Sequence, residues 1–131
     1  MHSIIQPDGW KPPKGYANAV LAEGRALYVG GQIGWNGNQV FESHDFIGQM
    51  EQALKNIVAL VEEAGGKVGD IVRLTWFVTD KKEYVSRQRE VGQAYRRVMG
   101  KHFPAMSVLV VAGLIEDEAL VEIEATAVLG G

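Results

Sequence analysis

The segment from Leu120 to Val128 places the tightest constraint on the fold, because its residues alternate strictly between two chemical types. Every second residue is apolar and the residues between them are acidic or polar: Val121, Ile123, Ala125 and Ala127 against Glu122, Glu124 and Thr126. Successive side chains of a β-strand point to opposite faces of its sheet. The pattern therefore predicts a strand in a sheet that is covered on one face and open on the other.

Two helices are available to cover that sheet. In the first, apolar residues recur at steps of three and four on one face: Phe46, Met50, Ala53, Ile57, Val61 and Ala64. Ser43 or Asp45 is placed to cap its start, and Gly65-Gly66 favours a left-handed stop. The second helix is predicted from Asp80, which has capping-box spacing to Glu83, to Gly100.

The remaining segments favour strands. Tyr16–Ala22 and Arg25–Val29 flank Glu23-Gly24 and indicate a β-hairpin. Ile71–Thr79 is rich in β-branched and aromatic residues, with Trp76 expected in the core, and Met106–Ala112 is predicted to be a buried strand. The order is β-β-α-β-α-β-β, an α+β fold with two helices packed on one face of a mixed sheet. We expect one domain over residues 1–131, with residues 1–14 as an extended, proline-rich arm.

Composition excludes several classes of protein. No apolar run reaches the roughly 18 residues of a membrane span, and the chain does not start like a signal peptide. The absence of cysteine excludes disulfides, thiolate zinc sites and cysteine nucleophiles, and it fits the reducing cytoplasm, where we expect the protein to act. The formal net charge of −3 argues against a nucleic-acid partner.

Glu122 and Glu124 are the residues with the most chemistry to offer. They share the open face of the last strand with apolar neighbours, and such a face tends to find a partner, which predicts a closed homo-oligomer. A carboxyl group that is partly buried between subunits can orient a water molecule or transfer a proton. From spacing alone, the simpler interpretation is that both are solvated residues on a half-exposed strand.

Other motifs predict less. His2, His44 and His102 lack metal-ligand spacing, and we expect neither a metal nor a cofactor. Gly30-Gly31 is interpreted as a bulged strand end that another backbone or a ligand approaches closely. The basic residues of the second helix are mixed with acidic ones and predict a solvated face: Arg87, Arg89, Arg96 and Arg97 with Glu83 and Glu90.

Several motifs in order resemble the RidA family, also called YjgF or endoribonuclease L-PSP. They run from Gly15-Tyr16-Ala17-Asn18-Ala19-Val20 through Val29-Gly30-Gly31-Gln32-Ile33, Gln52–Ile57, Phe77–Asp80 and His102–Ala105 to Val121-Glu122-Ile123-Glu124-Ala125. The resemblance implies a chorismate-mutase-like fold and a homotrimer with small-molecule clefts between subunits. It also implies hydrolysis of reactive enamines and imines, such as 2-aminoacrylate, to 2-oxo acids and ammonia.

The resemblance implies site residues one by one. Glu122 matches the glutamate that holds the water, and Tyr16 matches a cleft tyrosine. The expected ligand-binding positions are Gly30, Gly31, Gln88, Met106 and Val108. Met106 stands where the family's motif has arginine, and a thioether cannot pair with a carboxylate. Lys14, close to Tyr16 in the sequence, is one candidate replacement.

Three functions follow as hypotheses. The first is a divergent deaminase acting on an imine, an enamine or a related substrate, for which Met106 suggests a more apolar ligand, uncharged or aromatic. The second is a trimeric protein that binds a small metabolite without catalysis. The third, an endoribonuclease, is disfavoured by the net negative charge and by the lack of a histidine pair.

Overall fold

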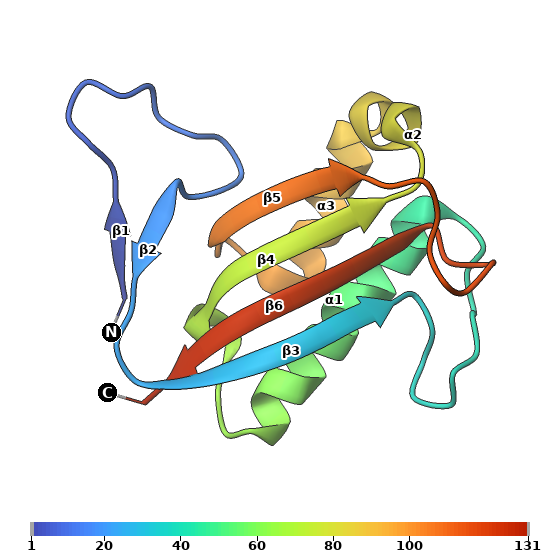
Figure 1. Ribbon diagram of the computed structural model, residues 1–131, viewed down its shortest axis with the longest axis horizontal. Helices are drawn as coiled ribbons and strands as arrows, with labels where there is room; N and C mark the ends of the chain where they lie inside the picture. The colour runs from blue at the N-terminus through green and yellow to red at the C-terminus, as the bar shows by residue number, and fades with distance from the viewer. Residues whose placement is uncertain (1, 131) are drawn as a thin grey trace.

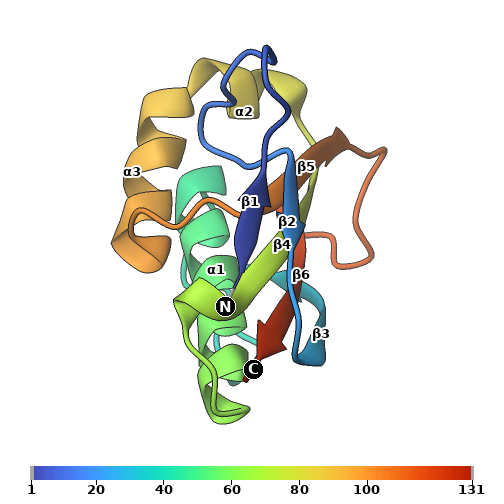
Figure 2. The same ribbon diagram turned by 90° about the vertical axis from the view of Figure 1, so that its left-hand side faces the viewer.

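The computed structural model describes residues 2–130 and contains two layers, a four-stranded sheet and helices packed on one of its faces (Figures 1 and 2). The strand order is β3-β6-β4-β5, and only the β4–β5 pair is parallel. The bounds of these strands are Arg25–Ile33 for β3, Ile71–Val78 for β4, Ala105–Val110 for β5 and Val121–Leu129 for β6. The predicted α+β fold with a mixed sheet is confirmed.

The helical layer consists of α1 (Phe46–Glu63) and α3 (Gln88–Met99), with the short α2 (Lys81–Ser86) leading into α3. A single 3-10 turn, Val68–Asp70, precedes β4. In Figure 2, where the sheet is seen nearly edge-on, these helices lie on one side of it and the other side is open. None of the helices in residues 2–130 combines the length and the apolar character that crossing a membrane requires.

The alternation of β6 positions the core as predicted. Val121, Ile123 and Ala127 are fully buried against the helices, whereas Glu122 and Glu124 lie on the other face. Trp76 of β4 is also buried in this core. Burial of apolar surface between the sheet and the helices is the main stabilising contribution to such a fold.

The start of α1 uses neither predicted cap in the expected way. Asp45 occupies the N-cap position, but its side chain makes no capping hydrogen bond, because both carboxylate oxygens accept from Arg87 at 2.7 and 3.2 Å. Ser43 instead accepts a hydrogen bond from the backbone N–H of Asp45. At the other end, Gly65 adopts a φ of 92°, which confirms the left-handed stop.

The second predicted helix is broken, and the prediction of one continuous helix from Asp80 to Gly100 is wrong. Asp80 caps α2 by accepting from the backbone N–H groups of Lys82 and Glu83. The chain leaves helical geometry at Arg87, whose guanidinium also binds Glu83 and Glu90 as well as Asp45. These ion pairs tie the break to the start of α1.

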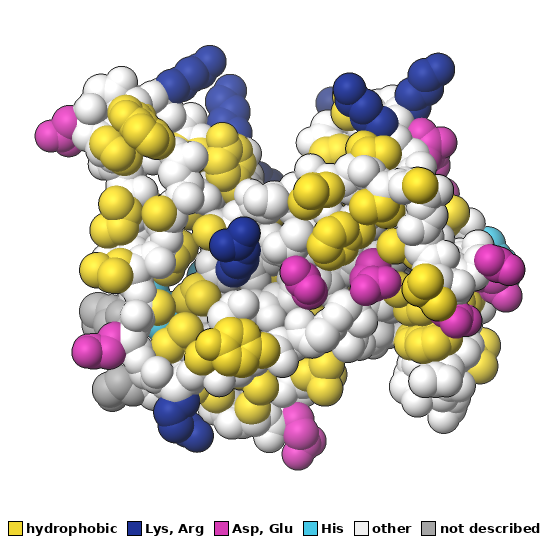
Figure 3. Space-filling model, viewed as in Figure 1, with side chains coloured by type: hydrophobic (Ala, Val, Ile, Leu, Met, Phe, Trp, Pro, Cys, Tyr) yellow, Lys and Arg dark blue, Asp and Glu magenta, His cyan; other side chains and the backbone are white. Residues whose placement is uncertain are grey.

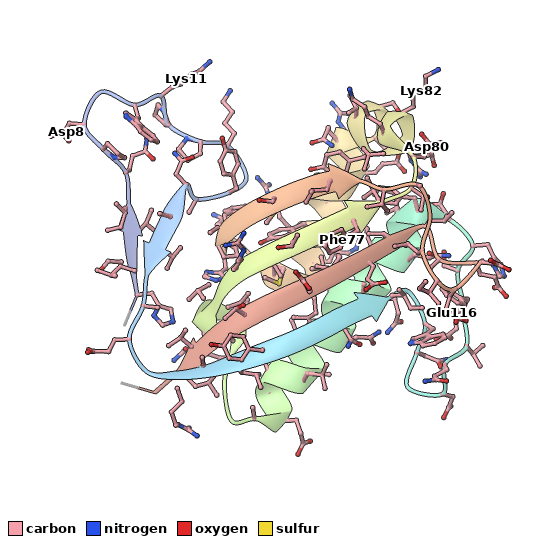
Figure 4. The ribbon with its side chains drawn as sticks, viewed as in Figure 1. Asp8, Lys11, Phe77, Asp80, Lys82 and Glu116 are labelled. Carbon is pink, nitrogen blue, oxygen red and sulfur yellow. The ribbon has the colours of Figure 1, made fainter. Side chains whose placement is uncertain are left out.

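The predicted hairpin at Glu23-Gly24 is also wrong. β2 (Ala19–Leu21) pairs with β1 (Ser3–Ile5) in a separate two-stranded sheet, not with β3. Gly24 has a φ of 144°, and this conformation directs β2 away from the main sheet. In Figure 1 the N-terminal segment therefore forms a lobe beside the sheet, with Asp8 and Lys11 at its tip in Figure 4.

The strand β5 differs from the buried strand that was predicted. It lies at the edge of the sheet, and Leu109 is 45% exposed. The apolar run arises because the two faces of β5 have different surroundings. Met106 and Val108 pack against the core, while Ser107 and Leu109 lie on the open face of the sheet. An apolar run at a sheet edge can thus mark a half-covered strand.

Candidate functional site

A cavity of about 690 Å³ lies between the N-terminal lobe and the helical layer. The lobe contributes Lys14, Gly15 and Tyr16. One wall is formed by residues of α3, among them Gln88 and Arg96. The remaining lining comes from the sheet, α2 and the loop before β5: Trp76, Tyr84, Phe103, Met106 and Val108. In Figure 3, which views the open face of the sheet, a notch separates the lobe from the rest of the upper surface, with basic side chains on either side of it.

Backbone pairing explains why Tyr16 reaches this cavity. The N–H of Ala17 donates to the carbonyl oxygen of Pro104 at 3.0 Å, and Ala17 forms a parallel bridge with Ala105 at the start of β5. This contact fixes the lobe to the free edge of the sheet. Tyr16 and Met106, distant in the sequence, are thereby brought to the same cavity.

Four of the residues expected at the site line this cavity together: Tyr16, Gln88, Met106 and Val108. Lys14, the candidate replacement for the missing arginine, also lines it. Gln88 begins α3, and its side-chain amide donates to the carbonyl oxygen of Tyr84 at 2.6 Å. That bond holds Gln88 at the break between α2 and α3.

Aromatic rings make up the inner wall of the cavity. Trp76 and Tyr95 are stacked with centroids 6.4 Å apart, and Tyr95 stacks on Phe103 at 5.4 Å. Burial raises the pKa of the Tyr95 phenol, which therefore stays protonated and donates to the carbonyl oxygen of His102 at 2.6 Å. These rings offer a rigid apolar surface, and Tyr95 is engaged in holding the loop before β5.

Glu122 and Gly31 lie together elsewhere in the molecule. The register of β3 against β6 shifts between Val29 and Gln32, which confirms the expected bulge at Gly30-Gly31. A Cβ atom at Gly31 would overlap the Glu122 carboxylate, whereas a Cβ at Gly30 would meet nothing within 4 Å. Gly31 is therefore the position that leaves room for the Glu122 side chain.

The carboxylate of Glu122 has no hydrogen-bond or ion-pair partner within residues 2–130. It is half-buried, and its strand partners are Ile33 of β3 and Phe77 of β4. Figure 4 marks Phe77 near the centre of the sheet, between the strands that flank it. A free carboxylate at this place can accept a proton or orient a water molecule.

The predicted site residues therefore form two groups on opposite faces of the sheet. Met106 is paired with Leu74, which is buried against the helices. Glu122 is paired with Phe77, whose side chain lies on the opposite, open face of the sheet. Residues opposite each other in a ladder share a face, and their sequence neighbours point the other way. A single chain thus does not bring Glu122 next to Met106 or Tyr16.

Sequence reasoning missed part of the cavity wall. Gln88, Gly92 and Arg96 follow one another at steps of four along α3 and all line the cavity. Arg96 was expected on a solvated face of mixed charge, and it is indeed exposed, but its place beside the cavity was not expected. The sequence did contain a signal for this wall. Residues spaced by four lie on the same side of a helix, and a glycine among them leaves space beside that side.

The histidines give no sign of a metal site. His102 makes a 2.6 Å contact from Nε2 to the carbonyl oxygen of Ile71, and His44 is an exposed residue 3.6 Å from Glu118. Within residues 2–130, no three His, Asp or Glu side chains are grouped in a way that could hold a metal ion.

Comparison with known proteins supports the classification that the fold and the site suggest. The sequence profile of the endoribonuclease L-PSP family matches residues 8–129. A RutC family protein of Pasteurella multocida is 36% identical over 128 residues, which cover 98% of each chain. The 2-iminobutanoate/2-iminopropanoate deaminase of Escherichia coli is 39% identical over 108 residues, 80% of each chain.

Solved structures agree in architecture. A Rid family protein of unknown function from Yersinia pestis, YyfB, aligns over 98% of both chains with 32% identity and a TM-score of 0.87. The Escherichia coli YjgF product aligns over 88% of both chains with 36% identity and a TM-score of 0.68. The architecture is thus the chorismate-mutase-like α+β fold of these proteins. This chain belongs to the endoribonuclease L-PSP family, which is the RidA or YjgF family.

Proposed function

We propose that this protein is a deaminase that hydrolyses an imine, an enamine or a related substrate, with a site shared between subunits. The observation that carries the proposal is the Glu122 carboxylate, unpaired among residues 2–130 and seated over Gly31. The Escherichia coli relative at 39% identity, named as an imine deaminase, supports the reaction class.

Hydrolysis of an imine requires few catalytic groups. An enamine first tautomerises to its imine, and a water oxygen then attacks the imine carbon. Glu122 takes a proton from that water as the C–O bond forms and passes it to the imine nitrogen, which gives a carbinolamine. Glu122 then takes the carbinolamine hydroxyl proton and passes it to the amino nitrogen, so that the C–N bond breaks, ammonia leaves and the C=O bond forms. The product is a 2-oxo acid. Positioning of the water and the substrate supplies most of the rate enhancement in such a step.

The separation of the two residue groups supports a homotrimer with clefts between its subunits. Since Glu122 and Met106 lie on opposite faces of the sheet, a site that uses both groups requires a second chain. The open face also exposes apolar side chains, with Tyr28 80% and Leu109 45% exposed. Light scattering should give three times the chain mass of 14.3 kDa, and a monomer at micromolar concentration would contradict the shared site.

Met106 defines which substrates we expect. A thioether has no donor for a carboxylate, so β5 does not supply the contact on which 2-iminobutanoate and 2-aminoacrylate, with their small apolar parts, would most depend. These two compounds should be poor substrates. The cavity instead presents aromatic rings, which favours a larger apolar substrate. A metabolite-handling role of this kind fits the cytoplasm, as does the absence of cysteine.

The test is the rate of ammonia release from imines generated in place by an amino-acid oxidase, compared with spontaneous hydrolysis. Glu122→Gln should reduce the enzymatic rate by about a hundredfold, the size typical of a lost acid–base group. Glu124→Gln, two residues along the same face, is the matched control and should keep the rate. Equal rates for Glu122→Gln and the parent would overturn the assigned role.

The cavity also favours a second candidate, a trimer that binds a metabolite without converting it. Met106 is the specific observation behind it, because it removes the expected cation from β5. Ligands that raise the melting temperature and are recovered unchanged would select this function over catalysis.

A further inference from the structure

Two cations face the cavity from opposite sides. Lys14 belongs to the N-terminal lobe and Arg96 to α3, and both line the cavity. Neither side chain forms a hydrogen bond or an ion pair with any of residues 2–130. Their neighbours behave differently: Arg87 binds Asp45, Glu83 and Glu90, and Arg97 binds Glu51 at 2.8 Å. Within residues 2–130 the Arg96 guanidinium is thus unpaired, unlike those of Arg87 and Arg97.

The charge of the cavity wall is uncompensated. No Asp or Glu is found among the described residues that line the cavity. The local excess of positive charge, focused between low-dielectric walls, attracts anions. A guanidinium is well suited to a carboxylate, since it can donate two parallel hydrogen bonds.

The inner part of the same cavity is apolar and flat. Trp76, Tyr95 and Phe103 form a continuous stack, and Met106 and Val108 complete the wall from β5. The indole N–H of Trp76 is buried without a hydrogen-bond partner among residues 2–130. An unpaired buried donor carries an energetic cost. The stacked rings beside it form the apolar part of the wall.

Gly92 leaves space beside Arg96. It is one helical turn before Arg96 on α3, and a Cβ added to it would meet no atom within 4 Å. Glycine in a helix interior is less stable than alanine by roughly 1 kcal/mol. A helical glycine that no protein atom contacts is therefore explained by the room that it provides in the cavity wall.

We propose that Arg96, assisted by Lys14, binds the anionic group of the ligand, and that the ligand is a carboxylate with an aromatic or similarly bulky apolar body. The carboxylate lies at the basic rim and the apolar body against the Trp76–Tyr95–Phe103 stack. This inference rests on the proposed function in that it names the substrate class of the same site. It also assigns to α3 the recognition of charge that β5, with Met106, does not supply.

The binding test uses three probes and isothermal titration calorimetry on the full-length protein. Phenylpyruvate is an aromatic 2-oxo acid, its methyl ester lacks the charge, and 2-oxobutanoate lacks the aromatic body. Phenylpyruvate should bind at least about tenfold more tightly than either of the others, the size expected for one charge-assisted contact or one buried ring. Equal affinity for the acid and the ester would overturn the proposal.

Variants identify the residues responsible. Arg96→Met should weaken phenylpyruvate binding about tenfold or more and leave the ester unchanged, while Arg96→Lys should retain part of the affinity. Arg89→Met is the matched control, because Arg89 is exposed on the same helix, lacks an ion pair within residues 2–130 and does not line the cavity. An Arg96→Met protein that binds phenylpyruvate like the parent would refute the assignment.

A second variant tests the space in the cavity independently of charge. Gly92→Leu places a side chain in the cavity on a residue with good helix propensity, so the melting temperature should not fall and phenylpyruvate binding should be lost. Unchanged binding by a folded Gly92→Leu protein would show that the ligand lies elsewhere.

The two proposals fail in different ways. Phenylpyruvate binding that depends on Arg96, with no ammonia release from any imine, would support this inference and refute the deaminase. Glu122-dependent turnover of small imines that is unaffected by Arg96→Met would support the deaminase and refute this inference.

Discussion

The two faces of the sheet are built from the same four strands but have opposite chemistry. The face against α1 and α3 is apolar and closed, with Leu74, Trp76 and Ile123 at most 1% exposed. The open face carries Glu122 and Glu124 among exposed apolar side chains, and Figure 3 shows acidic groups at its centre. The covered face is completed by the chain itself, so its residues determine stability. The open face is left incomplete and is available to a second subunit, whereas the cavity with Met106 and Val108 lies on the covered side, at its β5 edge.

The largest expected effect comes from opening a gap in the covered face. Ile123→Ala removes a fully buried side chain and should lower the free energy of unfolding by about 2–5 kcal/mol, from lost burial and the cavity that remains. Glu124→Ala, the next residue on the open face, should change it by less than about 0.5 kcal/mol. Urea unfolding followed by circular dichroism measures both, and similar losses would contradict the assignment of the faces.

The next effect separates function from stability on the open face. Gly31→Ala introduces a Cβ where the Glu122 carboxylate lies, so that flexible side chain must move, and imine hydrolysis should fall about tenfold or more. The fold should be retained. Gly30→Ala is the control, since its added Cβ meets nothing within 4 Å. Loss of activity in both variants, or in neither, would show that Gly31 does not position Glu122.

A buried amide at the edge of the core gives an intermediate effect. Gln49 is fully buried, donates to the carbonyl oxygens of Ser43 and Glu118, and accepts from the N–H of Leu120. Gln49→Leu leaves these backbone groups unpaired and should cost about 1–3 kcal/mol. Hydrogen exchange at Leu120 should accelerate in the variant. Unchanged protection would mean that Gln49 does not hold the loop before β6.

The smallest effect is a dependence of stability on pH. Hydrogen bonds from Arg87 hold the pKa of Asp45 below its usual value, and Arg97 does the same for Glu51. A carboxyl group whose pKa is lowered by folding contributes stability above its unfolded pKa, and that contribution is lost as pH falls through the folded pKa. Unfolding midpoints should therefore decline below about pH 4, and Arg97→Met should flatten part of that decline. An unchanged profile would contradict the role of this ion pair.

Patterns of neighbouring residues correctly predicted the strand β6 and the helix α1. The period of two in β6 and the steps of three and four in α1 assigned each side chain to a face, and Gly65 and Gly100 ended the helices where expected. Patterns failed where a contact distant in the sequence took over. Asp45 was one of the two residues expected to cap α1. Its carboxylate instead accepts hydrogen bonds from Arg87, 42 residues away in the sequence.

The sequence named candidate site residues one by one but did not indicate how they lie relative to one another. Tyr16, Gln88, Met106 and Val108 share a cavity because one backbone contact at Ala17 fixes the lobe to β5. The place of Glu122 on the opposite face follows from strand register. A shared subunit site remains a prediction, because it depends on how two surfaces meet and not on the conformation of one chain.

The sequence by itself determined which residues are inside and which are outside, because the periods of strands and helices are properties of the local backbone. Only the tertiary structure decided that β2 pairs with β1 and not with β3, that the second helix breaks at Arg87, and that the exposed Arg96 lies at the edge of a cavity. These choices depend on long-range contacts, whose energies are set by pairings that no local pattern specifies.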